Sequence, residues 1–160
     1  MRAVGELIAV EETELEAVAR AVGTQLGIAL PGYPVAEQRG WLAEIQSLSG
    51  NDFDRAFIER LRAANGTLLI SVAQVRAATR NDLIRAFAIS ANDAVIRELG
   101  YLEISGLVNF DSLPRPSPPA GVRVTGFDRD GGLPAAGLWV VLLTAAIAGL
   151  AALGRLVQSR

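Results

Sequence analysis

Apolar side chains recur at intervals of three and four over residues 1–107, which is the spacing of one face of an α-helix. Helix-ending residues at Gly27, at Gly50 and over 79–82 divide this pattern into segments. Strict apolar–polar alternation, the pattern of a half-buried strand, does not extend over any useful length. The pattern predicts helices over residues 1–27, 35–48, 51–78 and 83–106.

Three of the four predicted helices are long and amphipathic, and the connections between them are short. Such helices pack as antiparallel neighbours, so we expect an all-α fold, an antiparallel helical bundle over residues 1–107. The first helix begins at Met1 in the middle of its apolar pattern and without an N-cap residue. We therefore expect an incomplete bundle, with three long helices plus one short helix, that a preceding helix, a partner chain or a second copy completes.

A different pattern occupies residues 133–153, where the chain is apolar and carries no charged residue. At about 1.5 Å per residue, a helix of this length covers roughly 30 Å, the thickness of a bilayer core. Trp139 lies near one end of the run, and Arg155 stops it. We predict a transmembrane helix over residues 133–154 and a short basic tail over 155–160. A buried helix at the end of the chain is the alternative.

Between bundle and span, residues 108–132 contain four prolines and end in a glycine pair. This composition favours an extended, partly polyproline chain over packed structure. We interpret the segment as a stalk that separates the bundle from the membrane. A proline-rich ligand for a partner domain is the alternative interpretation.

Composition narrows the chemistry that is open to the chain. It has no histidine, no cysteine and no lysine, which excludes thiol nucleophiles, disulfides, imidazole bases and metal sites that depend on His or Cys ligands. A net charge of −2 argues against nucleic acid as a partner. Neither a phosphate-binding glycine loop nor a nucleophile elbow is present. We expect no enzyme activity, no catalytic residues and no cofactor.

Three carboxylates on the apolar faces are the remaining candidates for chemistry. A helical wheel places Glu11 between apolar positions of the first helix and Glu98 between those of the last, with Glu12 beside Glu11 and Asn65 at the margin of the third helix. Carboxylates that converge from facing helices can bind iron or manganese, so a carboxylate-only metal site from Glu11, Glu12 and Glu98 is one interpretation. The other is structural ion pairing with arginines such as Arg20, Arg62 or Arg97.

Residues 49–103, which include the sequence Phe53-Asp54-Arg55-Ala56-Phe57, resemble the ferritin-like helical-bundle family known as domain of unknown function 4142. The helix-then-proline step of residues 14–31 is similar to that family as well, so the resemblance covers about residues 1–107. It implies a ferritin-like bundle and, in these arginine-rich chains, an actinobacterial type with a proline-rich stalk. It also implies a helix before Met1, behind a secretory signal.

The resemblance also implies histidines at four positions of the bundle. As we align them, these positions hold other residues here, namely Leu7, Glu12, Asn65 and Glu98.

Two functions remain open at this stage. The first is a non-enzymatic, membrane-anchored bundle that works through protein contacts or in envelope maintenance. Because the resemblance is to exported proteins, it favours a bundle outside the cell membrane, while a tail anchor with a cytoplasmic bundle is the alternative, since the first residues are too acidic for a signal peptide. The second function is a ferritin-like metal-binding or redox protein with a carboxylate-only site.

Overall fold

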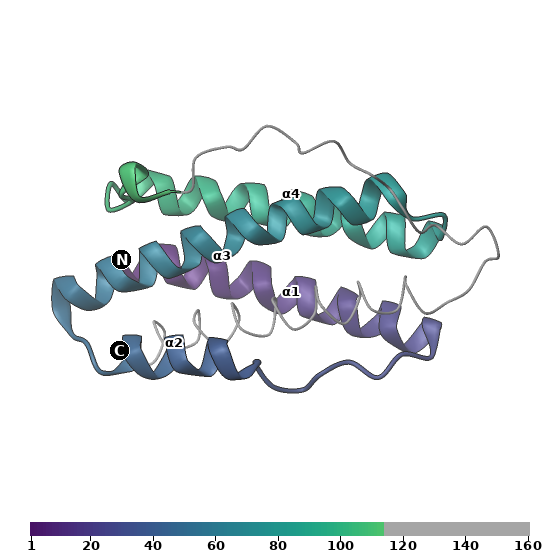
Figure 1. Ribbon diagram of the computed structural model, residues 1–160, viewed down its shortest axis with the longest axis horizontal. Helices are drawn as coiled ribbons and strands as arrows, with labels where there is room; N and C mark the ends of the chain where they lie inside the picture. The colour runs from purple at the N-terminus through teal and green to yellow at the C-terminus, as the bar shows by residue number, and fades with distance from the viewer. Residues whose placement is uncertain (114–160) are drawn as a thin grey trace.

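The computed structural model describes residues 1–113, which form four α-helices and a short 3₁₀ helix, with no strand in this part of the chain (Figure 1). The predicted all-α fold and all four predicted helices are confirmed. The bounds are α1 Arg2–Leu26, α2 Ala36–Gln46, α3 Gly50–Ala78, α4 Asp82–Ile104 and the 3₁₀ helix η1 Phe110–Ser112.

The helix ends follow local backbone chemistry. Helix α1 ends at Gly27, whose φ of 67° is in the left-handed region that glycine adopts without strain. Helix α4 begins after Asn81, whose side-chain oxygen accepts hydrogen bonds from the backbone N–H groups of Leu83 and Ile84. Helix α3 begins at Gly50, one residue before the predicted start at 51, so Asn51 and Asp52 lie inside the helix.

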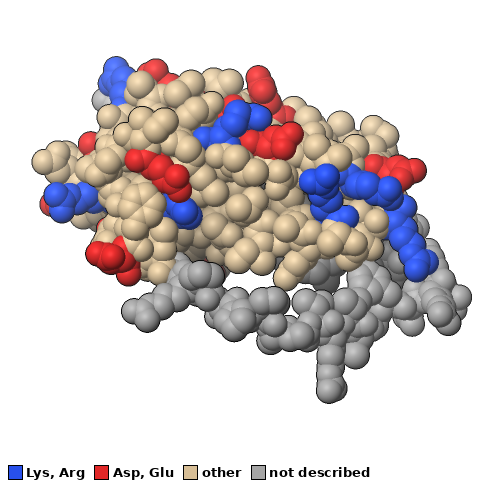
Figure 2. Space-filling view, turned by 90° about the horizontal axis from the view of Figure 1, so that it is seen from above, with Lys and Arg blue, Asp and Glu red and all other residues tan. Residues whose placement is uncertain are grey.

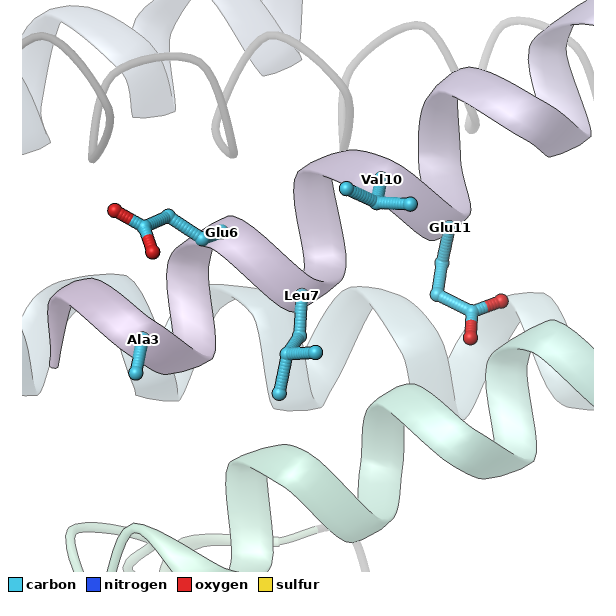
Figure 3. Close-up of a pocket in the computed structure, with 5 residues that line it drawn as sticks. All are labelled: Ala3, Glu6, Leu7, Val10 and Glu11. Atoms are coloured by element: carbon cyan, nitrogen blue, oxygen red, sulfur yellow. The ribbon is translucent and has the colours of Figure 1, made fainter.

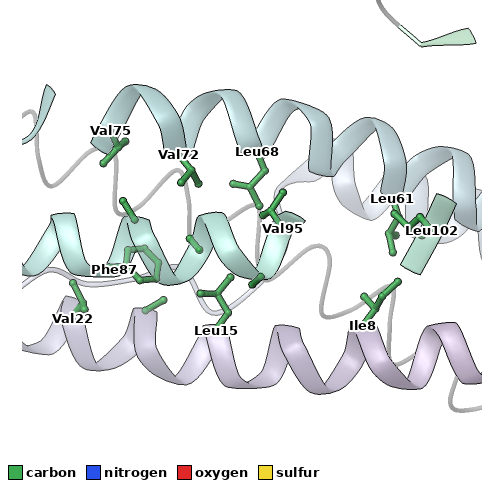
Figure 4. Close-up of a cluster of buried hydrophobic side chains, with 14 of the residues drawn as sticks. Ile8, Leu15, Val22, Leu61, Leu68, Val72, Val75, Phe87, Val95 and Leu102 are labelled. Atoms are coloured by element: carbon green, nitrogen blue, oxygen red, sulfur yellow. The ribbon is translucent and has the colours of Figure 1, made fainter. Parts of the chain in front are cut away.

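Helix α4 packs against both α1 and α3, and it lies between them in the close-up of the core (Figure 4). Helices α1 and α3 run in the same direction and α4 runs opposite to them, while the short α2 packs on α3. The long helices thus form an antiparallel bundle in which α4 is the central element. Its expected completion by a preceding helix, a partner chain or a second copy stays a prediction.

The core is built in layers that repeat every seven residues along α1 and α3, and every seven or eight residues along α4 (Figure 4). Each layer takes one apolar side chain from α1, one from α3 and one from α4, and these side chains are all buried. Because α4 runs opposite to its neighbours, its residue numbers fall as theirs rise. The three layers are Ile8, Leu61 and Leu102, then Leu15, Leu68 and Val95, then Val22, Val75 and Phe87.

Within residues 1–113, no helix is both long enough and apolar enough to cross a membrane. The predicted transmembrane helix over 133–154, the basic tail and most of the predicted stalk lie outside the described residues. The first residues of that stalk include η1, so its beginning forms a short helical turn rather than extended chain.

Candidate functional site

Three polar side chains are buried inside the bundle, one from each long helix. Glu12 of α1 and Glu98 of α4 are each 1% exposed, and Asn65 of α3 is fully buried. On its own helix, each of the three lies four residues from the member of the Ile8 layer and three residues from the member of the Leu15 layer. The three side chains therefore share a level between these two layers. We call Glu12, Asn65 and Glu98 the polar layer.

Hydrogen bonds join the members of the polar layer. The Asn65 side-chain nitrogen Nδ2 donates to Oε2 of Glu98 over 2.9 Å, and the carboxyl groups of Glu12 and Glu98 are also hydrogen-bonded to each other. Within residues 1–113, three buried oxygens have no hydrogen-bond partner: Oε2 of Glu12, Oδ1 of Asn65 and Oε1 of Glu98. Unpaired buried oxygens are costly, so the polar layer has unused capacity for a proton or a cation.

Burial alters the acidity of both carboxyl groups. Desolvation raises the pKa of Glu98 to about 7, and the hydrogen bond from Asn65 opposes that rise. Desolvation, followed by the charge of Glu98, raises the pKa of Glu12 well above its ordinary value. Two ionised carboxylates are acceptors only, so a hydrogen bond between them requires a proton. The proton belongs to the pair of carboxyl groups, both of which have a raised pKa.

Glu11, expected in the core, lies instead at the edge of the α1–α4 interface, so that prediction is wrong. Its carboxylate accepts hydrogen bonds from Nε and Nη2 of Arg97, and this partner lowers the pKa of Glu11. The buried face of α1 contains Ile8, then Glu12 four residues later, then Leu15 three residues after that. Glu11 comes one residue before Glu12 and therefore lies beside this buried face rather than on it.

The expected pairing of carboxylates with arginines is therefore right for Glu11 and wrong for the polar layer. Arg97 is bound by Glu11, while Arg20 pairs with Glu16 of its own helix. Arg62 pairs with Glu103 at the α3–α4 interface. None of the ion pairs found within the described bundle reaches Glu12 or Glu98.

The expected metal-ligand set does not assemble as a unit, because Glu11 is turned away from Glu12 and Glu98. Residues 1–113 contain no group of three or more His, Cys, Asp or Glu side chains that could hold a metal ion. The buried oxygens that have no hydrogen-bond partner within residues 1–113 belong to two carboxyl groups and one amide, that of Asn65. Oxygen donors of this kind suit a hard cation such as Mg²⁺, Mn²⁺ or Ca²⁺.

Outside the core, an open hollow of about 400 Å³ runs along the first half of α1 (Figure 3). Leu7 and Val10 are 48% and 55% exposed there. Its two carboxylates are those of Glu6 and Glu11, and Glu11 is already bound by Arg97. The hollow is a mainly apolar surface, better suited to a protein contact than to catalysis.

Charged side chains do not form a single-sign field on the face drawn in Figure 2. Over the described residues of that face, arginines and carboxylates occur side by side, with broad uncharged areas between them. Three isoleucines of α3 and α4 are among the exposed apolar residues, namely Ile70, Ile89 and Ile96. Several basic side chains adjoin one another at the right-hand end of this face, with a carboxylate beside them (Figure 2).

No curated protein and no solved structure matches the chain. A protein family does match, over residues 1–100, which takes in α1, α2, α3 and most of α4 and includes all three members of the polar layer. Its description is "Domain of unknown function (DUF4142)", which assigns no activity. The match spans more than half of the sequence, and the chain therefore belongs to the DUF4142 family.

Proposed function

We propose that this protein is a non-enzymatic, membrane-tethered helical bundle that acts through protein contacts on the outer side of the cell membrane. The observation that carries the proposal is the charge-free run over residues 133–153, which follows a bundle whose own helices are not apolar enough to cross a membrane. Leaving such a run in water is unfavourable, while a bilayer core accommodates it.

The proline-rich segment supports the tether. Residues 114–132 carry prolines and glycines that disfavour a regular helix between the bundle and the span. A semi-extended chain of this composition holds a folded domain away from the lipid surface. The partners we propose are thus the bilayer, through residues 133–154, and a protein that meets the bundle.

The outer surface of α1 supports a role in protein contacts. Leu7 and Val10 are half exposed on neighbouring turns and line the hollow along that helix. Exposed apolar side chains that gather beside a concavity are typical of interaction sites. A partner chain or a second copy of this chain is the kind of protein we propose to lie there.

A fractionation experiment tests the tether. The full chain is expected to stay with membranes during alkaline carbonate extraction and to leave them only in detergent. A Leu143→Arg/Ile147→Arg variant places two charges near the middle of the run, each costing about 3 kcal/mol at a bilayer centre, and is expected in the carbonate extract. The Leu143→Ala/Ile147→Ala variant, which stays apolar, is the control. Release of the unmodified chain by carbonate would refute the tether.

Metal binding is the second candidate function, and the unpartnered oxygens of the polar layer favour it. We propose Glu12, Glu98 and the Asn65 amide oxygen, rather than Glu11, as its ligands. The test is metal analysis of the purified full chain after exposure to Mn²⁺ or Fe²⁺. One equivalent of metal, lost in Glu98→Gln and kept in Glu103→Gln, would support this function. A chain that retains no metal would refute it.

A further inference from the structure

We propose that the outer face of α1 binds the same face of a second copy of this chain, with the two α1 helices antiparallel. This contact rests on the proposed function, a role in protein contacts, and identifies the partner that lies at the hollow along α1. The outer face consists of six exposed residues, namely Ala3, Leu7, Val10, Glu14, Ala17 and Ala21.

Helix α1 has two apolar faces. One face, from Ile8 to Val22, is buried, and among the described helices α1 packs extensively on α4 only. The outer face stays exposed, with Leu7 and Val10 on neighbouring turns (Figure 3). Its members recur at intervals of four and three residues, the spacing at which one helix meets another in a coiled coil. A helix with two such faces packs between two neighbours, and residues 1–113 supply one of them.

The sizes of the side chains on the outer face fit a second copy. In an antiparallel pair centred between Val10 and Glu14, Leu7 lies level with Ala17 of the second copy. The largest apolar side chain of the face therefore meets a small one, which leaves room for it. Because two-fold symmetry repeats every contact, the pairing of Leu7 with Ala17 occurs twice.

The charges at one edge of the outer face are complementary in the same arrangement. Glu6 directly precedes Leu7, and Arg20 directly precedes Ala21, so both hold the same position in the repeat. Side chains at such flanking positions form ion pairs between the helices of a coiled coil. In the antiparallel pair, Glu6 of each copy meets Arg20 of the other. Arg20 is 47% exposed and has five N–H donors, so it can bind Glu6 beside its present partner Glu16.

The acidic residues of α1 select the antiparallel direction. A parallel pair would place Glu14 of the two copies in one layer and Glu6 beside Glu11, and like charges in contact repel each other. The antiparallel pair places each Glu14 level with Val10 of the second copy. It brings the two Glu11 carboxylates toward the two-fold axis, but Arg97 already binds each of them.

Sedimentation of the full chain in detergent micelles, measured over a series of dilutions, tests the contact. The unmodified chain is expected to dimerise, and the Leu7→Glu/Val10→Glu variant to be monomeric, because four added carboxylates would meet in each dimer. Both side chains are about half exposed, so this variant is expected to fold, which circular dichroism checks. The matched control is Ile70→Glu/Ile96→Glu, at exposed positions of α3 and α4, which should still dimerise.

Two further measurements test the register of the pair. Glu6→Arg and Arg20→Glu should each weaken the dimer roughly 2- to 30-fold, because two exposed ion pairs are lost, and the combined variant should restore it. The chain has no cysteine of its own. Oxidation of Leu7→Cys chains mixed with Ala17→Cys chains should therefore give a disulfide-linked dimer, while neither variant alone should form one.

Four results would overturn the proposal. They are a monomeric unmodified chain, a dimer that persists in Leu7→Glu/Val10→Glu, cross-linking of Leu7→Cys chains to one another, and a combined charge reversal that does not restore the dimer. If Leu7→Glu/Val10→Glu does not fold, the charge reversal and the cross-linking decide. A monomer that resists carbonate extraction would refute the dimer and leave the tether, whereas a dimer that carbonate releases would refute the tether alone.

Discussion

Truncation of Leu61 tests the layered core. Leu61 is fully buried on α3 and, with Ile8 and Leu102, fills the layer next to the polar layer (Figure 4). Leu61→Ala removes side-chain atoms from a site that three helices enclose. Because each helix is fixed by further layers on the other side, the surroundings can close only part of the resulting cavity.

The expected cost follows from this enclosure. Leucine-to-alanine changes in packed cores lower the free energy of unfolding by about 3–5 kcal/mol, the larger values belonging to sites that collapse least. For a domain of this size, each kcal/mol lowers the melting temperature by roughly 4–8 °C. We therefore expect Leu61→Ala to melt at least roughly 12 °C below the unmodified chain.

The assay is thermal unfolding of the full chain in a mild detergent, monitored by circular dichroism. The matched control is Ile70→Ala. Ile70 lies on the same helix but is 62% exposed, so its truncation should change the free energy of unfolding by only about 0.5 kcal/mol. Similar melting temperatures for the two variants would refute the layered core. So would a cost of less than about 1 kcal/mol for Leu61→Ala.

Three further changes probe the helix ends and the edge of the α1–α4 interface. Gly27→Ala forces a β-carbon into left-handed backbone and should cost about 1 kcal/mol in a urea titration. Asn81→Ala removes the side-chain cap of α4 and should also cost about 1 kcal/mol, while Asn81→Ser should recover most of it. The Glu11–Arg97 ion pair is partly exposed, so a double-mutant cycle should give a coupling energy of about 0.2–1 kcal/mol. Because Arg97 lowers the pKa of Glu11, that coupling should be present above pH 4.5 and lost as pH falls further.

The helices could be predicted from sequence because their signals are local. Intervals of three and four, the glycine that ends α1 and the asparagine that starts α4 each act within a few residues. The start of α3 could not be placed as well, because Asn51 and Asp52 are good capping residues that the structure includes inside the helix. The preference of Asn and Asp for the N-cap position contributes less to where α3 begins than the packing of Phe53 and the residues after it does.

The candidate site was predicted only in part, because its members meet across three helices. The burial of Glu98 follows from its own helix. The choice between Glu11 and Glu12 depends on which face α1 turns toward α4, a difference of one residue that a helical wheel resolves poorly. The contact between Asn65 and Glu98 depends on the register of α3 against α4, which no local pattern specifies. The sequence does carry a signal for the burial of Asn65, because Asn65 lies between the apolar positions Leu61 and Leu68 at intervals of four and three residues.

The two kinds of titrating group give the bundle opposite responses to pH. The Glu11–Arg97 pair weakens in acid, whereas the polar layer weakens as pH rises from the weakly acidic range. We therefore expect the bundle to be most stable in weak acid and to lose stability on both sides of that range. Glu12→Gln/Glu98→Gln should remove the loss on the basic side only.

Cysteine labelling in intact cells tests the central claim, a bundle tethered on the outer side of the membrane, most directly. The chain has no cysteine of its own, so Ser90→Cys, at an exposed position of α4, and Ser159→Cys, beyond the apolar run, each provide one thiol. A membrane-impermeant maleimide is expected to label the Ser90→Cys variant at once and the Ser159→Cys variant only after permeabilisation. Protection of the Ser90→Cys variant in intact cells would contradict the claim.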